Sequence, residues 1–238
     1  MKHEIIPGKL YLIPSLLDEE AIETIPHYLI DSIKKCSLFL VEQPKTTRRF
    51  LKKLWKEIVI DHYEWLEISD GGESVRQHML NALSAGKNVG ILSEAGCPGI
   101  ADPGQLLVKA AQLRGYTVSP LVGPNSIILA LMASGMNGQQ FSFHGYLPID
   151  AGDRKKKIKE LENISLKSGA TQIFIETPYR NQAMLADLIQ TCNQQTLLCV
   201  AADITGKNES IVTQSISDWK KLTTSYHKRP AIFLIQAS

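Results

Sequence analysis

Short apolar runs alternate with longer amphipathic segments along the whole chain. A run of about four to eight apolar residues is typical of a buried strand, whereas a longer amphipathic segment is typical of a helix. This alternation predicts α/β units built on largely parallel sheets. We expect strands at Leu10–Ile13, Leu38–Glu42, Glu64–Ile68, Val89–Ser93, Thr117–Val122, Phe141–Tyr146, Thr171–Glu176, Leu197–Ala202 and Ala231–Gln236.

The segment Ser119–Pro124 (SPLVGP) is the best candidate for a boundary between domains. It carries two prolines and a glycine near the middle of a chain of 238 residues. Segments of this composition commonly separate compact units. We expect an N-terminal α/β domain over residues 1–119 and a C-terminal α/β domain over residues 120–238.

Composition and cysteine spacing argue against several classes of protein. The 26 Lys and Arg exceed the 24 Asp and Glu by two, so overall charge does not predict a polyanionic partner. The four cysteines form no CxxC pair and have no histidine at metal-ligand spacing, which disfavours a disulfide framework and a metal site such as zinc. No apolar run reaches the length of a membrane span, and we expect a cytoplasmic protein without a membrane segment.

The stretch Asn88–Gly104 (NVGILSEAGCPGIADPG) is the most informative for function. A buried strand leads into a loop with three glycines and two prolines. Glycines let a ligand approach the backbone, and ligands of open α/β sheets bind at the carboxyl ends of strands, so we favour ligand binding by this loop. For Asp102 alone, followed by Pro103, we favour capping of the next helix. The GxxxxGK[ST] and GxGxxG patterns are absent, which disfavours a nucleoside triphosphate or a conventional dinucleotide.

The stretch Leu121–Met136 (LVGPNSIILALMASGM) predicts a helix that is apolar on nearly all sides and ends at Gly135. Such a helix is expected to be buried on most sides, as between two lobes. Asn125 and Ser126 fall in its first turn, where side chains or free N–H groups can meet a ligand. Simple capping explains these two residues equally well.

Five segments, in the same order along almost the whole chain, carry a resemblance to a known family. They are Leu10–Pro14, Ile91–Gly104, Pro120–Gly135, Phe143–Pro148 and Ile173–Arg180. In them the chain resembles the tetrapyrrole-methylase superfamily of S-adenosylmethionine-dependent methyltransferases, and within it the branch that methylates a cytidine 2′-hydroxyl in small-subunit ribosomal RNA. The resemblance implies two α/β domains, S-adenosylmethionine in the cleft between them, and usually a homodimer.

The resemblance also implies which residues meet the cofactor. From the first domain they are Pro14, Ser93, Ala95, Gly96 and Ile100. From the second domain they are Ser126, Ile127, Glu176, Ala201, Pro230 and Ala231. These contacts are largely backbone and apolar, which suits an adenosine and a thioether better than a phosphate.

The chain departs from the ribosomal RNA branch in segments that face the substrate. The segment Val41–Arg48 (VEQPKTTR) keeps the Glu and the final Arg of the corresponding motif but loses its Asp. Ala202 and Gly206 stand where that branch has Arg and Lys. Cofactor-facing segments thus persist while substrate-facing polar groups are fewer, so the methyltransferase assignment is better supported than the RNA acceptor.

Methyl transfer from a sulfonium requires mainly that donor and acceptor are aligned. A base is needed only where the acceptor must lose a proton, as a hydroxyl must. Our first candidates for that base are Glu42 and Glu94, although capping of the loop explains Glu94 equally well. Asp102, His144 and Glu176 are further candidates, although His144 lies in an apolar run and is more typical of a core or dimer-facing histidine.

Basic side chains cluster in two places, Lys45–Lys56 (KTTRRFLKKLWK) and Arg154–Lys159 (RKKKIK). If the first cluster is helical, Phe50, Leu54 and Ile58 face the core and its cations point outward. Either cluster can neutralise RNA phosphates, in which case affinity falls with salt. A solvated helix face is the ordinary meaning of such a run and is slightly favoured.

These observations favour an S-adenosylmethionine-dependent methyltransferase with an RNA ribose hydroxyl as the leading acceptor. The expected partners are a second copy of the chain and ribosomal RNA or the small ribosomal subunit. One alternative is methylation of a small molecule such as a tetrapyrrole or corrinoid precursor. A second alternative is a partner module that binds the cofactor without catalysis.

Overall fold

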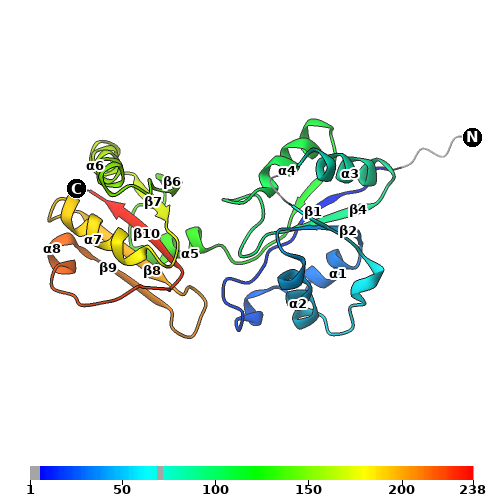
Figure 1. Cartoon of the computed structure of the whole chain (residues 1–238), viewed down its shortest axis with the longest axis horizontal. Helices are drawn as coiled ribbons and strands as arrows, with labels where there is room; N and C mark the ends of the chain where they lie inside the picture. The colour runs from blue at the N-terminus through cyan, green and yellow to red at the C-terminus, as the bar shows by residue number, and fades with distance from the viewer. Residues whose placement is uncertain (1–5, 69–71, 238) are drawn as a thin grey trace, which may run out of the picture. The chain divides into compact units, whose positions relative to one another are not determined.

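The computed structural model describes residues 6–68 and 72–237 and divides into two compact units, Met1–Asn125 and Ser126–Ser238 (Figure 1). Each unit contains one five-stranded sheet. The boundary predicted from the sequence, after Ser119, falls inside strand β5 (Val118–Pro120). Because β5 pairs with β1 (Leu10–Leu12), the chain stays with the first unit as far as Asn125.

The first sheet is parallel throughout, with the strand order β3-β2-β4-β1-β5. Its apolar strands are buried because helices cover both faces, which is typical of parallel sheets. Figure 1 shows α3 and α4 on one side of this sheet and α1 and α2 on the other. The remaining elements of the unit are α1 (Leu29–Ile33), β2 (Cys36–Val41), α2 (Pro44–Leu54), β3 (Glu64–Glu67), α3 (Glu73–Ser84), β4 (Asn88–Leu92), α4 (Gly104–Leu113) and two short 3-10 helices, Ile22–Thr24 and Ile60–His62.

The second sheet is mixed, with the strand order β6-β7-β10-β8-β9. Strands β6 (Phe141–Tyr146) and β7 (Thr171–Ile175) are parallel, whereas β10 (Ala231–Gln236) is antiparallel to β7 and to β8 (Leu197–Ala202). The expectation of a largely parallel sheet is therefore wrong for this unit. Strand β9 (Ser210–Ser215) was not predicted from the sequence, and it returns beside β8 through a short loop rather than through a crossover helix.

Helices cover both faces of the second sheet. A core cluster joins one face to α6 (Ala151–Ser168), α7 (Asn181–Thr191) and α8 (Ile216–Trp219). Helix α5 (Ser126–Ser134) packs against β8, β9 and β10. It buries Ile127, Ala130 and Leu131, but Ile128 and Met132 are exposed, so the helix is less buried than its apolar sequence predicted. Within the described ranges, no helix is long and apolar enough to span a membrane.

Candidate functional site

The predicted cofactor residues of the first unit lie mostly where β1 and β4 end. These two strands are parallel neighbours, so the segments that follow them leave the sheet at the same edge. Ser15 and Gly96 pair through two backbone hydrogen bonds, from Ser15 N to Gly96 O (2.8 Å) and from Gly96 N to Ser15 O (3.2 Å). The Ser15 hydroxyl also donates to the carbonyl of Ser93 (2.8 Å). Pro14, Ser93, Ala95 and Gly96 are therefore brought together.

A third segment reaches the same edge through Gly123 and Pro124. A Cβ atom on Gly123 would lie 2.2 Å from the Pro14 side chain, so only glycine permits this close packing. The Cys97 thiol donates to the carbonyl of Pro124 (3.5 Å). Gly96 itself has a φ of +72°, a conformation that glycine adopts readily. Gly96 and Gly123 thus suit the backbone conformation and packing of this edge, and a Cβ atom on Gly96 would lie 3.4 Å from the Leu17 side chain and 3.5 Å from the carbonyl oxygen of Pro124.

Asp102 fastens the far end of the glycine-rich loop. Its carboxylate accepts hydrogen bonds from the backbone N–H of Gly99 (2.9 Å) and of Gly104 (2.8 Å). Asp102 therefore binds the N–H of the first residue of α4, but the N-cap is Pro103 rather than Asp102, because α4 begins at Gly104 and not at the expected Pro103. Burial raises the pKa of Asp102, and these N–H groups partly oppose the increase. Ile100, another predicted cofactor residue, lies in this loop with its side chain exposed.

The two carboxylates predicted as candidate bases are neighbours. Glu42 follows β2, Glu94 follows β4, and these strands are adjacent and parallel. The Glu42 carboxylate accepts a hydrogen bond from the backbone N–H of Glu94 (3.0 Å). Partial desolvation raises the pKa of Glu94, and the nearby charge of Glu42 raises it further. Glu94 is thus a stronger proton acceptor than an ordinary glutamate.

The second unit also gathers its predicted cofactor residues at one end of a sheet. Ile232 on β10 lies opposite Ala201 on β8 and opposite Ile175 on β7. The chain segments that flank these positions therefore share one end of the three central strands. That end carries Glu176, Ala201, Pro230 and Ala231.

The first turn of α5 belongs to the same end of the second sheet. After the helix, Asn137 N donates to the side chain of Gln236 (3.1 Å), at the opposite end of β10. Ser134 at the end of the helix accepts a hydrogen bond from Thr213 of β9 (2.8 Å). The helix therefore runs away from Ala231, and its first residues, Ser126 and Ile127, start beside the other predicted residues of this unit.

Glu176 has one satisfied and one unsatisfied carboxylate oxygen. Its Oε1 accepts from Arg180 Nε (2.9 Å) and Nη2 (2.6 Å) and from the backbone N–H of Thr177 (2.6 Å). Its Oε2 is buried and has no partner in the described part of the protein, and the side chain is 1% exposed. A buried acceptor without a donor is costly, so this oxygen fits an amino or hydroxyl group of a ligand.

Arg229, just before β10, connects its own segment to the loop between β8 and β9 and to the start of α7. Its Nε donates to Asp203 (2.6 Å), its Nη2 donates to the carbonyl of Asn208 (2.7 Å), and its own carbonyl accepts from Asn181 (2.5 Å). The sequence analysis singled out neither Arg229 nor Arg180. The i,i+4 spacing of Glu176 and Arg180 was a usable signal. Nothing local in the sequence marks Arg229, because its partners are distant in the chain.

His144 forms part of the structure of the second unit rather than of its predicted site residues. Its Nε2 is 2.8 Å from Oε1 of Gln172, a fully buried residue of the neighbouring strand.

Gly206, which replaces a lysine of the resembled branch, occupies a tight turn in which its N–H donates to the carbonyl of Asp203 (2.8 Å).

Most of the first basic segment forms α2, which ends at Leu54, before Lys56, and the cations of the segment are exposed as expected. Phe50 is buried and Leu54 is partly buried against the core. Within the described ranges, one ion pair involves this segment, between Arg49 and Glu19 (2.7 Å). Arg48 lies over the ring of Trp65, with its guanidinium carbon 5.1 Å from the ring centroid. The other cations of the segment are Lys45, Lys52, Lys53 and Lys56.

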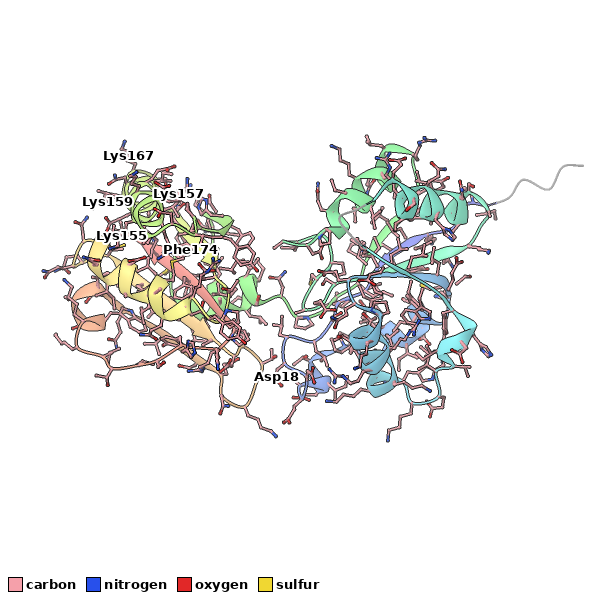
Figure 2. All side chains as sticks on the ribbon, in the orientation of Figure 1. Asp18, Lys155, Lys157, Lys159, Lys167 and Phe174 are labelled. Carbon is pink, nitrogen blue, oxygen red and sulfur yellow. The ribbon has the colours of Figure 1, made fainter. Side chains whose placement is uncertain are left out.

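The second basic segment, at the start of α6, is largely neutralised. Arg154 is buried, not outward-facing as its place in the run suggested, because it donates to Asp187 of α7 (2.5 and 2.8 Å). Figure 2 shows Lys155, Lys157 and Lys159 along this helix. Acidic partners lie within 4 Å of the four lysines: Asp187 for Lys155, Asp153 for Lys156, Glu160 for Lys157 and Glu162 for Lys159.

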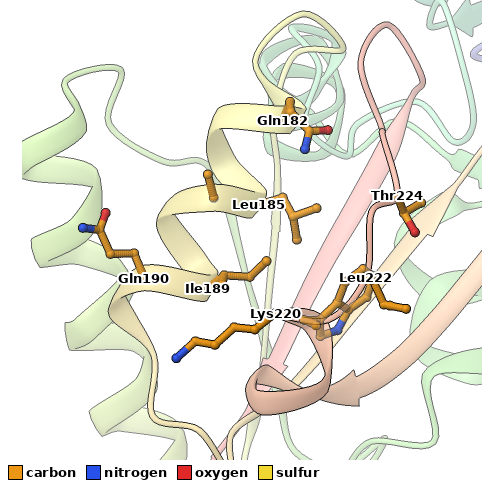
Figure 3. Close-up of a pocket in the computed structure, with 9 residues that line it drawn as sticks. Gln182, Leu185, Ile189, Gln190, Lys220, Leu222 and Thr224 are labelled. Atoms are coloured by element: carbon orange, nitrogen blue, oxygen red, sulfur yellow. The ribbon is translucent and has the colours of Figure 1, made fainter.

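The second unit also contains a cavity of about 530 Å³ between α7 and the segment that follows β9 (Figure 3). Leu185 and Ile189 line one side, and Trp219, Lys220 and Leu222 line the other. None of the residues predicted from the sequence lines this cavity, and we do not assign it to the candidate site.

The chain is similar to proteins named ribosomal RNA small subunit methyltransferase I in several bacteria. It is 31% identical to the Bacillus subtilis (strain 168) protein over 212 residues, which cover 89% of this chain and 68% of that protein. The Vibrio cholerae protein is 30% identical over 206 residues, covering 85% of this chain and 67% of that protein. The Buchnera aphidicola protein is 29% identical over 236 residues, covering 96% and 78%. No family model matches the chain.

Solved structures of corrinoid and porphyrin methyltransferases share the fold. The methyltransferase CobJ has a TM-score of 0.64 and 15% identity, covering 97% of this chain and 95% of that one. Uroporphyrin-III C-methyltransferase of Thermus thermophilus, complexed with S-adenosylhomocysteine, has a TM-score of 0.55 and 14% identity, covering 96% and 97%. The fold and the relatives together confirm the resemblance. The chain belongs to the tetrapyrrole methylase family, among the relatives named ribosomal RNA small subunit methyltransferase I, and is a methyltransferase that uses S-adenosylmethionine.

Proposed function

We propose that this enzyme methylates a ribose 2′-hydroxyl of small-subunit ribosomal RNA. The relatives bear names that specify small-subunit ribosomal RNA. The observation on this chain that carries the proposal is the outward face of α2, whose cations have one acidic partner within the described ranges. A cationic helix face of this kind binds phosphates without needing to discard existing ion pairs. The structures named for corrinoid and porphyrin substrates are at most 16% identical and support the fold alone.

We propose that the residues gathered in each unit contact S-adenosylmethionine. The absence of a side chain at Gly96 lets a ligand approach the backbone there. The Oε2 of Glu176, which has no partner in the described part of the protein, can accept a hydrogen bond from an amino or hydroxyl group. Bound S-adenosylmethionine supplies a methyl group on a positively charged sulfur, so the leaving group needs no further activation. The protein's contribution is to align the acceptor oxygen and to exclude water.

Glu94 is our candidate for the base that removes the proton of the ribose hydroxyl. Glu42 holds the backbone of Glu94 and raises the pKa of its side chain. A base acts when deprotonated, so the rate falls as pH decreases through the raised pKa of Glu94. Removing the charge at Glu42 lowers that pKa and therefore moves the acid limb of the pH profile to lower pH.

We also propose that the enzyme is a cytoplasmic homodimer. The second unit exposes apolar side chains on its edge strand β6 and just after it, at Phe141, Tyr146 and Ile149. An edge strand with exposed apolar residues is a natural surface for a second copy. Light scattering on the purified chain tests this assignment, and a monomer at micromolar concentration would contradict it.

The decisive experiment offers radiolabelled S-adenosylmethionine and unmodified small ribosomal subunits to four proteins, the wild type and three variants. Wild type is expected to label the RNA at a position that then resists alkaline cleavage, because a 2′-O-methyl group blocks it. Gly96→Arg is expected to lose cofactor binding in calorimetry, whereas Gly115→Arg, which has a similar φ of +75° and open space around it, keeps it. Glu94→Gln is expected to keep cofactor binding and to lose about a hundredfold in turnover.

Two results would contradict these assignments. Labelling of a tetrapyrrole or corrinoid precursor instead of RNA would replace the proposed acceptor. Equal cofactor affinity in Gly96→Arg and wild type would remove the proposed cofactor site.

A further inference from the structure

An exposed aromatic ring stands beside the second group of cofactor residues. Tyr179 is 71% exposed and lies three residues after Glu176, in the loop between β7 and α7. The Nζ of Lys228 is 5.8 Å from its ring centroid. The ring of His227 lies 6.2 Å away, centroid to centroid, at 77° to it. Two loops distant in the sequence therefore surround one ring.

The backbone holds these residues in place. Lys228 N donates to the carbonyl of Pro178 (2.9 Å), which joins the two loops directly beside Tyr179. Lys228 has a φ of 62°, a conformation that a lysine seldom adopts, so surrounding contacts must impose it. Arg229 next in the chain is bound to Asp203 and Asn208. The ring is thus exposed on an anchored loop.

The chemistry of this cluster matches an unpaired base of a single-stranded RNA. Every base has a π-face that stacks on an aromatic side chain, and proteins recognise single-stranded RNA largely in this way. An ammonium group beside the ring can meet the phosphate of the stacked nucleotide. A protein or membrane partner would instead favour a wider apolar surface, whereas the neighbours of Tyr179 are His227, Lys228 and other polar loop residues.

We propose that Tyr179, with Lys228 and His227, forms a stacking site for one unpaired base of the RNA strand that carries the acceptor ribose. This inference rests on the proposed RNA acceptor. It assigns to the second unit a nucleic-acid contact separate from the cationic face of α2. The stacked base positions the strand, and Tyr179 takes no part in methyl transfer itself.

The test compares Tyr179→Leu, which removes the aromatic ring, with Tyr179→Phe, which keeps it. The probe is purified, unmodified small ribosomal subunits, and KM, kcat and direct binding are measured for each protein. Tyr179→Leu is expected to raise KM and the dissociation constant for subunits about tenfold. Tyr179→Phe is expected to stay within about twofold of wild type, and neither variant changes affinity for S-adenosylhomocysteine.

Lys228→Gly supplies an independent arm that does not depend on the ring. Glycine suits a φ of 62°, so the fold is preserved while the charge is removed. The slope of log affinity for subunits against log salt concentration is expected to become less negative by slightly less than one, which is the contribution of one phosphate contact.

The outcomes separate this inference from the proposed function. If wild type binds subunits without methylating them, the proposed acceptor fails, and the binding ratio of Tyr179→Leu to Tyr179→Phe still decides the stacking site. If wild type methylates subunits and Tyr179→Leu does so with an unchanged KM, the stacking site fails alone. If wild type neither binds nor methylates subunits, both are overturned.

Discussion

Two lysine-rich helices of similar composition behave differently in this fold. In α2, one ion pair is formed within the described ranges, and the cations face solvent. In α6, Arg154 is buried against Asp187, and each of the four lysines that follow has an acidic neighbour. The difference arises from where acids are placed, three residues along α6 and on the adjacent α7. A run of basic residues therefore predicts free positive charge only after its acidic neighbours are located.

The largest expected effect concerns the buried pair of α6. Arg154→Met leaves the buried Asp187 carboxylate with Lys155, 3.4 Å away, as its remaining ion-pair partner, and is expected to lower the free energy of unfolding by about 3 kcal/mol. Arg49→Met, which breaks the exposed pair of α2, is expected to cost less than about 1 kcal/mol. Urea unfolding of both variants measures the contrast. The double variant Arg154→Met/Asp187→Leu is expected to recover much of the loss, and equal costs for the two single variants would remove the distinction between the helices.

The next effect concerns RNA binding. Replacing Lys45 and Lys53 of α2 and Lys56 just after it together by Gln is expected to weaken binding to small ribosomal subunits about 10- to 100-fold. The slope of log affinity against log salt concentration is expected to become less negative by about two. The matched variant replaces Lys155, Lys156 and Lys157 of α6 by Gln and is expected to change affinity little, because their charges already face acids. Titration of each triple variant with small ribosomal subunits at several salt concentrations measures both the affinity and its salt dependence. An equal loss in both triple variants would mean that the acids of α6 do not screen its lysines.

The smallest effect concerns how the two helices begin. Asp150 caps α6, since its carboxylate accepts a hydrogen bond from Asp153 N (2.9 Å), whereas Gln43 precedes α2 without such a bond. Asp150→Ala is expected to lower the midpoint of thermal unfolding, because α6 loses the hydrogen bond from Asp153 N to its N-cap side chain. Gln43→Ala is expected to stay within about 0.5 kcal/mol of wild type. Thermal unfolding followed by circular dichroism provides the measurement, and indistinguishable midpoints would show that the cap of α6 is immaterial.

The first unit was more predictable from the sequence than the second. Strands such as Leu38–Val41 are buried on both faces and therefore form nearly continuous apolar runs. Strand β9 escaped detection because SIVTQS mixes apolar and polar residues and is only half-buried. The antiparallel arrangement of β8, β9 and β10 is likewise invisible in the spacing of apolar runs, since it depends on which strands become neighbours.

The candidate site was predictable where it consists of backbone. Glycine and proline positions around Gly96 and Gly123 identified a loop edge that the structure assembles. The side chains that hold the loops of the site together were not predicted. Arg229 and Asp203 are distant from each other in the chain, so no local sequence pattern marks their ion pair. Arg154 was wrongly placed in a solvent-facing run for the same reason, as its partner Asp187 lies on another helix.

The connections made by Arg229 also determine how this end of the second unit opens. The Arg229 side chain binds both ends of the loop between β8 and β9, at Asp203 and Asn208. Its carbonyl accepts a hydrogen bond from Asn181, and the adjoining Lys228 N–H donates to the carbonyl of Pro178. No one of these segments can leave without breaking bonds to the others. They therefore form one cooperative unit for local unfolding. We expect the amide protons of Asp203 and Lys228 to exchange with solvent through the same opening, and so to report the same free energy of local unfolding.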